Sequence, residues 1–584
     1  MTLLAALCVV GWASAGTSTS EEEARIAAET LSAASSSAPG VLRVWGDDQL
    51  GQLGNGPPLV QKDVPVPQGS LNNVIQVDGG SFHSVALLSD GSVVTWGHDS
   101  QGQLGNGPTS NDQPSPVTVA GLGPVKAISA GNGFTLALLQ NGQVRSWGTD
   151  DLNQLGNGAT TGNQDSPVAV VGLNNVKAIS AGGEHALALL TDATVMAWGR
   201  NSEGQIGNGT SGFGTHPASP VAVQNLSGVK AISAAGGHSL ALLENGTVMS
   251  WGTDLNGQLG NGAPSNPQPQ PLPAPVTGLT DVVAIDTGDQ HSLALLDDET
   301  VWSWGYDSDG RLGDGAPVAN QPAPVMVSGL SDVVGITAGH FGGYAIMSDS
   351  SVKSWGSDSR GQLGNGSNTN DAPEPVQVVG LTGVAAIGAS AFTGIAIRPL
   401  CEGKPATFAG SAGDDSFSGT AANDVVHFGA GDDSFFDYDG GDDVVCGGSG
   451  DDELFASNGE NTFNGGPGAD TLSGAGVDTL SYADGTAVKL NLVNGTNNKG
   501  DTFFGAFENV IGSEFDDKIV GNGLANRLAG LGGDDSLGGA GGADILIGAA
   551  GDDTLSGGAG NDTCSGGTGA DSADASCETT PGVP

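Results

Sequence analysis

The chain has 584 residues, too many for one ordinary core, with 100 glycines, 14% charged residues and a formal net charge of −47. A surface of that sign repels nucleic-acid phosphates and anionic lipid headgroups, so we expect no nucleic acid and no acidic membrane surface among its partners. Divalent cations are the natural partners of so many carboxylates.

The first 15 residues have the pattern of a secretory signal peptide. An apolar run from Leu3 to Trp12 precedes Ala13-Ser14-Ala15, which are small residues at a cleavage position. A short buried strand is the alternative interpretation of this run. No later segment reaches about 18 unbroken apolar residues, so no transmembrane segment is expected. The pattern predicts a secreted or cell-surface protein.

Four cysteines follow the signal peptide, namely Cys401, Cys446, Cys564 and Cys577. An even number in an exported chain predicts two disulfides. The simplest pairing joins the neighbours in sequence, Cys401 with Cys446 and Cys564 with Cys577. The sequence alone leaves all three connectivities open.

The dipeptide Trp-Gly recurs seven times, at Trp45, Trp96, Trp147, Trp198, Trp251, Trp304 and Trp355. The steps between them are 51, 51, 51, 53, 53 and 51 residues. Each unit contains short runs rich in Val, Ala and Ile with small-residue turns between them. This pattern predicts four strands per unit, which is the composition of a propeller blade.

The ends of this array complement each other. It opens with VLRVWG at Val41, a late strand without inner strands before it, and closes with VAAIGASAFTGIAI (384–397), inner strands without a Trp-Gly strand after them. Together they make one more complete blade, so the ring is expected to close on itself with seven blades over residues 40–399.

These units resemble the repeats of the regulator of chromosome condensation family, a seven-bladed propeller. The resemblance implies a scaffold whose variable loops bind partners, and it does not specify which partner. His83, His185, His238 and His291 share one blade position, and two interpretations are open for them: a ring of metal ligands, or hydrogen-bonded residues at strand starts. The tryptophans are interpreted as packing residues rather than a sugar-stacking platform.

From Gly410 the repeat length changes to nine residues with the pattern GGxGxDxUx, where U is apolar. Examples are GSAGDDSFS (410–418), GLGGDDSLG (530–538) and GAAGDDTLS (548–556). Glycines permit left-handed backbone and bring carbonyl oxygens inward, the aspartate adds a hard oxygen ligand, and xUx is a minimal strand. About two nonapeptides are expected to form each coil.

This pattern resembles the repeat-in-toxin family of calcium-binding parallel β-rolls. The resemblance implies several bound Ca²⁺ ions and assigns the ligand role to the sixth-position aspartates: Asp415, Asp424, Asp433, Asp443, Asp452, Asp470, Asp517, Asp535, Asp544, Asp553, Asp562 and Asp571. Asp517 is the weakest of these, because its unit lacks the inner glycines. Asn461 and Asn526 hold the same place without charge and are expected to bind poorly.

The predicted fold class is therefore all-β, a seven-bladed propeller followed by a calcium-binding parallel β-roll. The expected organisation is a signal peptide (1–15), a linker (16–39), the propeller (40–399), a first roll block (400–481), a strand-bearing spacer (482–511), a second roll block (512–574) and a tail (575–584). Burial of one apolar residue in nine does not offset the entropy cost of ordering so much glycine. The roll is therefore expected to fold only when ions bind.

The functional prediction is an extracellular calcium-binding protein whose propeller loops bind a protein or a cell-surface ligand. Two alternatives stay open: an inhibitor that caps a partner enzyme, and an extracellular hydrolase or lyase with a dispersed site. No nucleophile elbow, HExxH, phosphate loop or dinucleotide fingerprint occurs in the sequence, so no enzyme is predicted. The oligomeric state is not predicted.

Overall fold

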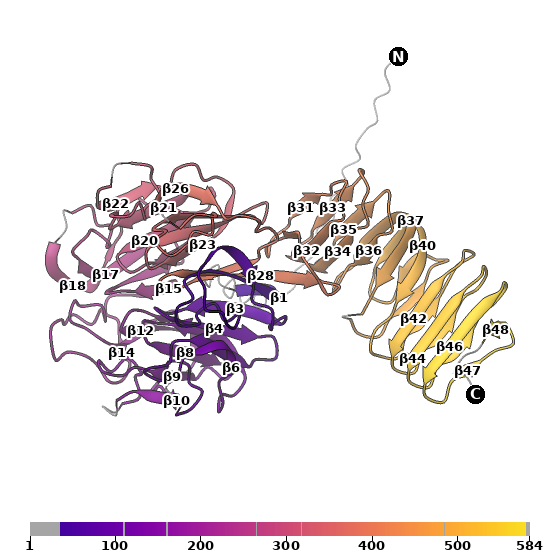
Figure 1. The fold of residues 1–584 in the computed structure, drawn as a ribbon, viewed down its shortest axis with the longest axis horizontal. Helices are drawn as coiled ribbons and strands as arrows, with labels where there is room; N and C mark the ends of the chain where they lie inside the picture. Colours follow the sequence, from indigo (N-terminus) through magenta and orange to yellow (C-terminus); the bar gives the residue numbers. More distant parts are fainter. Residues whose placement is uncertain are drawn as a thin grey trace, which may run out of the picture.

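The computed structural model describes residues 35–108, 111–158, 162–263, 266–316, 318–368, 370–483 and 485–579. Every regular element in these ranges is a β-strand, so the predicted all-β class is confirmed (Figure 1). None of these ranges contains a helix with the length and hydropathy needed to cross a membrane. The expected signal peptide and most of the expected linker lie outside the described residues.

The first part of the chain forms seven four-stranded blades around a central axis, and each blade runs from an inner to an outer strand. Blade one consists of β3 (Val74–Gly79), β4 (His83–Leu88), β5 (Val93–Gly97) and β6 (Gln113–Thr118). Blade two consists of β7 (Val125–Ala130), β8 (Phe134–Leu139), β9 (Val144–Gly148) and β10 (Gln164–Ala169). Blade three consists of β11 (Val176–Ala181), β12 (His185–Leu190), β13 (Val195–Gly199) and β14 (Val221–Ala222). Blade four consists of β15 (Val229–Ala235), β16 (His238–Leu243), β17 (Val248–Asp254) and β18 (Asn266–Pro275). Blade five consists of β19 (Val282–Thr287), β20 (His291–Leu296), β21 (Val301–Gly305) and β22 (Gln321–Met326). Blade six consists of β23 (Val333–Gly339), β24 (Gly342–Met347), β25 (Val352–Gly356) and β26 (Ala372–Gln377). Blade seven combines both ends of the array: β27 (Ala386–Ala389), β28 (Thr393–Cys401), β1 (Ser35–Gly46) and β2 (Lys62–Pro67).

Blade seven closes the ring in the way the sequence predicts. Strand β1 pairs antiparallel with β28 over seven residue pairs, from Gly40 with Pro399 to Gly46 with Thr393. The strand begins at Ser35, inside the segment for which a linker is expected, because Ser35 also pairs with Gln76 of the inner strand β3.

Tryptophans join each blade to the one before it. All seven are 0% exposed, and each indole N–H donates to a backbone carbonyl in the preceding blade, as Trp96 does to Gln52 at 2.8 Å. Trp45 in blade seven completes the circle by donating to Gln362 at 2.8 Å. Glycine is required beside each ring, because a Cβ on Gly54 would lie 2.7 Å from the indole of Trp96. The tryptophans are packing residues, as predicted.

Side-chain hydrogen bonds also join the inner strands of neighbouring blades around the central channel. The carboxylate of Asp78 accepts from the backbone N–H of Ala130 in the next blade at 2.9 Å, and that of Asp286 accepts from Ala338 at 2.8 Å. Since these bonds use the polar side chains that line the channel, the channel is part of the scaffold.

The second part of the chain is a parallel β-roll built from short strands that stack every second strand. Its strands are β30 (Phe408–Ala409), β31 (Ser416–Ser418), β32 (Val425–Ala430), β33 (Ser434–Asp437), β34 (Val444–Ser449), β35 (Glu453–Ala456), β36 (Thr462–Asn464), β37 (Thr471–Ser481), β38 (Lys489–Asn491), β39 (Thr496–Asn497), β40 (Thr502–Ile511), β41 (Lys518–Val520), β42 (Arg527–Gly532), β43 (Ser536–Gly538), β44 (Ile545–Ala550), β45 (Thr554–Ser556), β46 (Asp562–Thr568), β47 (Ser572–Ala573) and β48 (Cys577–Thr579). Leu528 pairs in register with Leu546, and Leu546 with Cys564, which gives two nonapeptides per coil.

The spacer does not divide the roll. Strand β37 of the first block pairs in parallel with β40 at the end of the spacer, and β38, which forms a hairpin with β39, pairs onward to β41 of the second block. Tyr482, Val488 and Phe507 belong to the same buried cluster as the apolar residues of both blocks. The spacer is a packed insertion, and one continuous core runs from Phe408 to Cys564.

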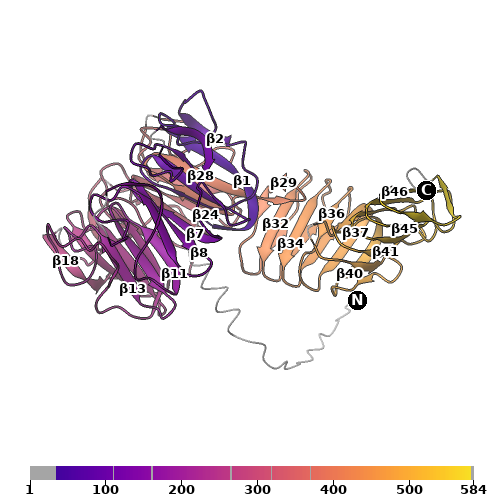
Figure 2. The ribbon, with the colours of Figure 1, turned by 90° about the horizontal axis from the view of Figure 1, so that it is seen from below.

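The roll docks on the propeller directly after blade seven (Figure 2). The short strand β29 (Lys404–Pro405) turns back on β28, and the disulfide between Cys401 and Cys446 joins β28 to β34. Ser350, in the turn before β25, donates its hydroxyl to the carbonyl of Ala409 at 2.8 Å and accepts from its N–H at 2.9 Å. Both predicted disulfides are present, the second between Cys564 and Cys577.

Candidate metal centre

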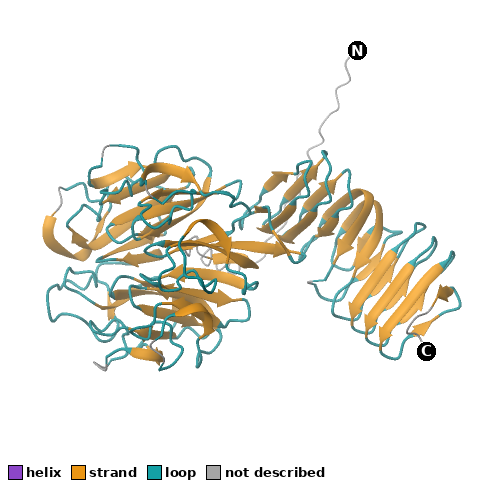
Figure 3. Cartoon of the chain, viewed as in Figure 1, coloured by secondary structure: helices purple, strands orange, loops and turns teal. Residues whose placement is uncertain are grey.

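The sixth-position aspartates lie in the turns that precede the short strands of the roll, among loops that alternate with strands along its length (Figure 3). Eleven of the twelve predicted ligands are at most 7% exposed, and Asp415 in the first coil is partly buried. Burying so many carboxylates is costly unless each one is compensated.

In all of the predicted ligands except Asp415 and Asp424, one carboxylate oxygen accepts a hydrogen bond from the backbone of an earlier coil. Oδ1 of Asp553 accepts from the backbone N–H of Asp535 at 2.9 Å, which is a charge-assisted hydrogen bond. The contact recurs in two columns. One contains Asp415, Asp433, Asp452, Asp470 and Asp501, then Asp517, Asp535, Asp553 and Asp571; the other contains Asp424, Asp443, Asn461 and Asp478, then Asn526, Asp544 and Asp562.

The second oxygen is buried without any hydrogen-bond partner in ten of these carboxylates, counted over the described residues. They are Asp433, Asp443, Asp452, Asp470, Asp478, Asp535, Asp544, Asp553, Asp562 and Asp571. A buried carboxylate oxygen without a partner is destabilising, so a repeated row of them indicates that something else neutralises the charge.

The first glycine of each repeat leaves room beside this oxygen. A Cβ on Gly548 would lie 2.0 Å from Oδ2 of Asp553 and 2.7 Å from the carbonyl oxygen of Gly566, one coil further on. On Gly447 it would lie 2.1 Å from Oδ2 of Asp452 and 2.7 Å from the carbonyl of Gly465. A carboxylate oxygen and a carbonyl oxygen from adjacent coils therefore line the same small space, which only glycine keeps open.

Oxygen donors of this kind fit Ca²⁺, which takes six to eight carboxylate and carbonyl oxygens. The described residues contain no group of three or more His, Cys, Asp or Glu side chains arranged around one point. Backbone carbonyl oxygens, such as those of Gly465 and Gly566, lie near the carboxylate oxygens and are further oxygen donors of the kind that Ca²⁺ takes. The residues present thus fit a hard cation held by one or two side chains and the surrounding backbone.

Burial raises the pKa of several of these aspartates. It raises that of Asp535 to about 7, against the lowering effect of the Asp517 N–H, and the charges of Asp517 and Asp553 raise it further. Burial acts in the same way on Asp433 and Asp470, whose pKa values rise to about 7. The protein by itself does not compensate these charges.

Three of the twelve predicted ligands differ from the rest. Asp424 has its Oδ2 occupied by the N–H and hydroxyl of Thr420, at 2.7 and 3.0 Å. Asp415 is bonded in the same way by Ser411, and Asp517 by Ser513. A hydroxyl residue at the second place of the repeat supplies these bonds, so the three carboxylates lack the free oxygen of the others.

Asp478 was missed by the sequence analysis although its Oδ2 is free. Its loop is one residue short, which moves the aspartate from the sixth to the fifth place. The following residues Thr-Leu-Ser, shared with Asp470 and Asp553, were the available signal. Asn461 joins this column differently, because its amide N–H donates to Asp478 at 3.0 Å and offers a cation no charge.

The four histidines that share one blade position make hydrogen bonds within the scaffold. His83, His185 and His238 contact a hydroxyl of the following blade through Nε2 at 2.9 to 3.0 Å, and His291 contacts the carbonyl of Gly342 at 3.2 Å. Each is fully buried at the start of a strand, and burial lowers the pKa of His83 to about 3. These contacts match the interpretation of hydrogen-bonded residues at strand starts.

Comparison with known families divides the chain at the same place as the fold. Residues 41–396 match the RCC1-like domain. Five stretches, 407–435, 437–472, 455–486, 511–546 and 538–573, match the RTX calcium-binding nonapeptide repeat.

Curated relatives align with about half of this chain. The ultraviolet-B receptor UVR8 of Arabidopsis thaliana is 31% identical over 312 residues, covering 52% of this chain and 70% of UVR8. The E3 ubiquitin-protein ligase HERC2 of Homo sapiens is 33% identical over 358 residues, covering 58% of this chain but 7% of HERC2. The chain thus spans a small fraction of the ligase.

Solved structures show the same fold at lower identity. Prp20p of Saccharomyces cerevisiae, studied for its binding to Gsp1p and histones, matches 62% of this chain and 92% of its own with a TM-score of 0.56 and 22% identity. Human WBSCR16 matches 61% of this chain and 99% of its own with a TM-score of 0.55 and 22% identity.

Proposed function

Because the chain belongs to the RCC1-like domain family and carries calcium-binding nonapeptide repeats, we propose that it is an extracellular binding protein. Its roll folds when Ca²⁺ binds, and its propeller presents a surface to a protein partner.

One observation carries this proposal: in the described part of the roll, ten buried aspartate oxygens lack a hydrogen-bond partner, and glycines hold space open beside most of them. Ordering a residue costs about 1–2 kcal/mol in backbone entropy. Each nonapeptide from residue 512 to 565 buries a single apolar side chain in return. The missing stabilisation comes from the cation, which binds the folded roll and not the unfolded one. Extracellular calcium modules act at about 10⁻⁴ to 10⁻³ M, so the roll would be ordered outside the cell.

An extracellular location is also supported by the two disulfides, since such bonds persist in oxidising compartments. The signal-peptide pattern at residues 1–15 agrees with it, although these residues are not described in the structure. Secretion and attachment to a cell surface remain parts of the proposal.

A loop on blade three is the best candidate for the partner-binding surface. Phe213 is 95% exposed at its tip, between Gly212 and Gly214, which have φ values of 109° and 89°. The base of the loop is fixed, because the Asn201 amide donates to the carbonyl of Thr210 at 3.0 Å. A large apolar side chain on a rigid support has the properties of a binding hot spot.

Hydrogen exchange on the full chain, with Ca²⁺ or with excess chelator, tests the calcium part of the proposal. We expect amides of residues 407–579 to exchange rapidly in chelator and slowly in Ca²⁺, while amides of the propeller stay protected in both. Equal protection of the roll in chelator would contradict it.

Capture of partners from the extracellular fraction tests the binding part. Phe213→Ala is expected to lose a partner that the wild type retains, whereas Leu255→Ala, which removes a 55% exposed side chain on blade four, is expected to keep it. If both variants capture the same proteins, Phe213 is not the anchor. Assays of a captured enzyme then separate inhibition from simple binding.

A further inference from the structure

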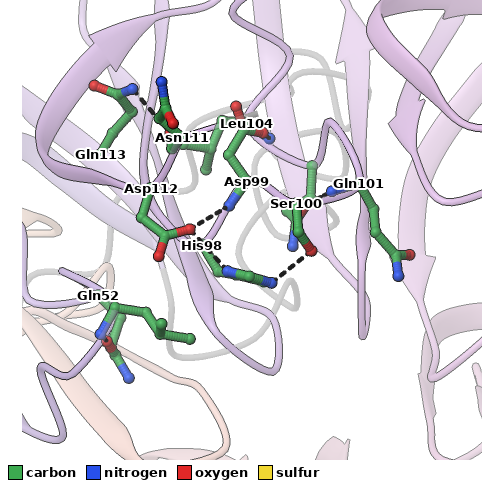
Figure 4. A network of polar contacts seen from close by, with 11 residues as sticks. Gln52, His98, Asp99, Ser100, Gln101, Leu104, Asn111, Asp112 and Gln113 are labelled. Carbon is green, nitrogen blue, oxygen red and sulfur yellow. Dashed lines mark hydrogen bonds and ion pairs between the residues drawn. The ribbon is translucent and has the colours of Figure 1, made fainter. Parts of the chain in front are cut away.

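Blade one carries a chain of hydrogen bonds that the sequence analysis did not detect (Figure 4). The imidazole of His98 contacts Oδ1 of Asp112 through Nδ1 at 2.8 Å and the hydroxyl of Ser100 through Nε2 at 2.6 Å. We propose that Ser100, His98 and Asp112 form a hydrolytic site that cleaves small aryl esters, a function beyond the calcium-dependent binding proposed above.

The order of contacts is the one acyl transfer requires. Because the carboxylate of Asp112 accepts the proton of Nδ1, Nε2 of the neutral imidazole is the acceptor for the Ser100 hydroxyl. Ser100 is therefore a candidate nucleophile with its general base in hydrogen-bond contact, and Asp112 is the positioning residue. Ser100 is exposed, so a substrate reaches it directly.

The fold places Asp112 independently of the histidine. Its Oδ1 also accepts from the backbone N–H of Asp99 at 3.1 Å. The same bond to the residue three after the blade tryptophan recurs elsewhere: Asn163 accepts from Asp150, Asn320 from Asp307, and Asp371 from Asp358. The acceptor is thus a repeated element of the propeller, to which blade one adds His98 and Ser100.

Blade six provides a natural comparison for this site. It has Asp371 in the place of Asp112 and Ser359 in the place of Ser100, but Ser357 stands where blade one has His98. Blade six therefore repeats the acid and the hydroxyl without the base. If the base is what activates the serine, only Ser100 reacts.

Aromatic side chains beside the imidazole suggest the substrate class. The ring of Phe82, 38% exposed, packs edge-on against His98 with 6.4 Å between centroids. The ring centroids of Phe82 and Phe392 are 6.1 Å apart, and those of Phe392 and Phe341 are 5.1 Å apart. This row of rings begins at the catalytic base and offers contact to an aromatic leaving group or acyl group.

The reaction needs no further reactant than water. The Ser100 oxygen bonds to the acyl carbon while the bond from that carbon to the phenol oxygen breaks, and the proton of the hydroxyl passes through Nε2 of His98 to the phenolate. Water then attacks the acyl-serine, gives a proton to His98, and releases a carboxylic acid as Ser100 recovers its proton. Because no oxyanion-binding group is part of the proposal, turnover is expected to be slow.

A fluorophosphonate probe on the full chain in Ca²⁺, followed by peptide mass spectrometry, tests the assignment. We expect phosphonylation of Ser100 and none of Ser359, and loss of the label in Ser100→Ala and His98→Asn. If the proposal were wrong, Ser100 would be labelled no faster than Ser359, or the label would persist in His98→Asn. Thermal unfolding of each variant checks that the propeller is intact.

Hydrolysis of phenyl acetate gives a second readout. His98→Asn is expected to lower kcat about 100-fold, the usual contribution of a general base. Asp112→Asn is expected to lower kcat with an unchanged KM, which a merely structural role would not produce. Ser359→Ala is the control and should equal the wild type. Equal rates in all four proteins would overturn the proposal even if the calcium-dependent binding function holds.

Discussion

The propeller and the roll are both built from short repeats, yet they bury opposite kinds of side chain. Each blade encloses a tryptophan without exposed surface, and the indole of Trp147 donates to Gln103 of the preceding blade at 3.0 Å. Each nonapeptide from residue 512 to 565 of the roll encloses one apolar residue, such as Leu546 or Leu555, and most of these repeats carry an aspartate with an unpaired oxygen.

A repeat thus does not have to provide its own stability. Burying a large apolar side chain stabilises by about 1.5–3 kcal/mol, and a blade buries many of them. A nonapeptide with one such residue falls short of the entropy of ordering nine, and its aspartates add a desolvation cost. The propeller is therefore stabilised by packing, whereas in the function proposed here the roll depends on a bound cation.

Trp147→Ala is expected to cause the largest effect, because it removes the packing on which this comparison depends. The cavity should lower the free energy of unfolding of the propeller by about 3–5 kcal/mol, measured by urea denaturation in chelator. Trp302→Ala is the control, since Trp302 is only partly buried and its indole contacts Thr300 of its own blade. A shift in the calcium midpoint of the roll would show that the two parts are not independent.

Gly548→Ala is expected to cause the next largest effect, and this effect is confined to the roll. The new Cβ would lie 2.0 Å from Oδ2 of Asp553, so it occupies the proposed ion space and costs about 1–3 kcal/mol of strain. The calcium midpoint measured by circular dichroism should rise. At Gly538 a Cβ would meet nothing within 4 Å, so Gly538→Ala should leave the midpoint close to wild type. Equal shifts would contradict the proposed position of the ion.

Asp553→Asn and Asp424→Asn separate two kinds of aspartate within the roll. Asp553 has a free Oδ2, whereas that of Asp424 accepts two bonds from Thr420. We expect Asp553→Asn to weaken calcium binding about tenfold, or about 1.4 kcal/mol, and Asp424→Asn to weaken it less. Calorimetric titration of both variants gives the comparison. An equal loss of calcium affinity would show that Asp424 is a ligand in the same way as Asp553.

Ser350→Ala is expected to cause the smallest effect, at the contact between the two parts. It removes one hydroxyl that both donates to and accepts from Ala409, which should cost about 1 kcal/mol. Hydrogen exchange at Ala409 should accelerate, with the later coils unchanged. Ser348→Ala removes an exposed hydroxyl from the same turn and serves as the control. No change at Ala409 would mean that the disulfide between Cys401 and Cys446 holds the contact alone.

Much of the fold follows from the sequence because both repeats are nearly regular in period. The unpaired fragments around Val41 and at 384–397 predict a closed ring, and β1 pairs with β28 as expected. The pairing of the nearest cysteines was one of three possibilities and is the one observed. The candidate site is less fully predicted. Asp415, Asp424 and Asp517 match the sequence pattern but have no free carboxylate oxygen, whereas Asp478 has a free oxygen but does not match the pattern.

The sequence by itself determined the number of blades, the length of a coil and the position of the acidic turns, because each of these follows from a local period. Only the tertiary structure decided which carboxylates keep a free oxygen, since a hydroxyl at the second place of the repeat folds back onto Asp424 but not onto Asp553. It also brought Asp112 beside His98 and Ala409 beside Ser350. The pairing of Ser350 with Ala409 joins the two different repeats, and the bond of His98 to Asp112 occurs where blade one departs from its own repeat, so neither contact follows from a period.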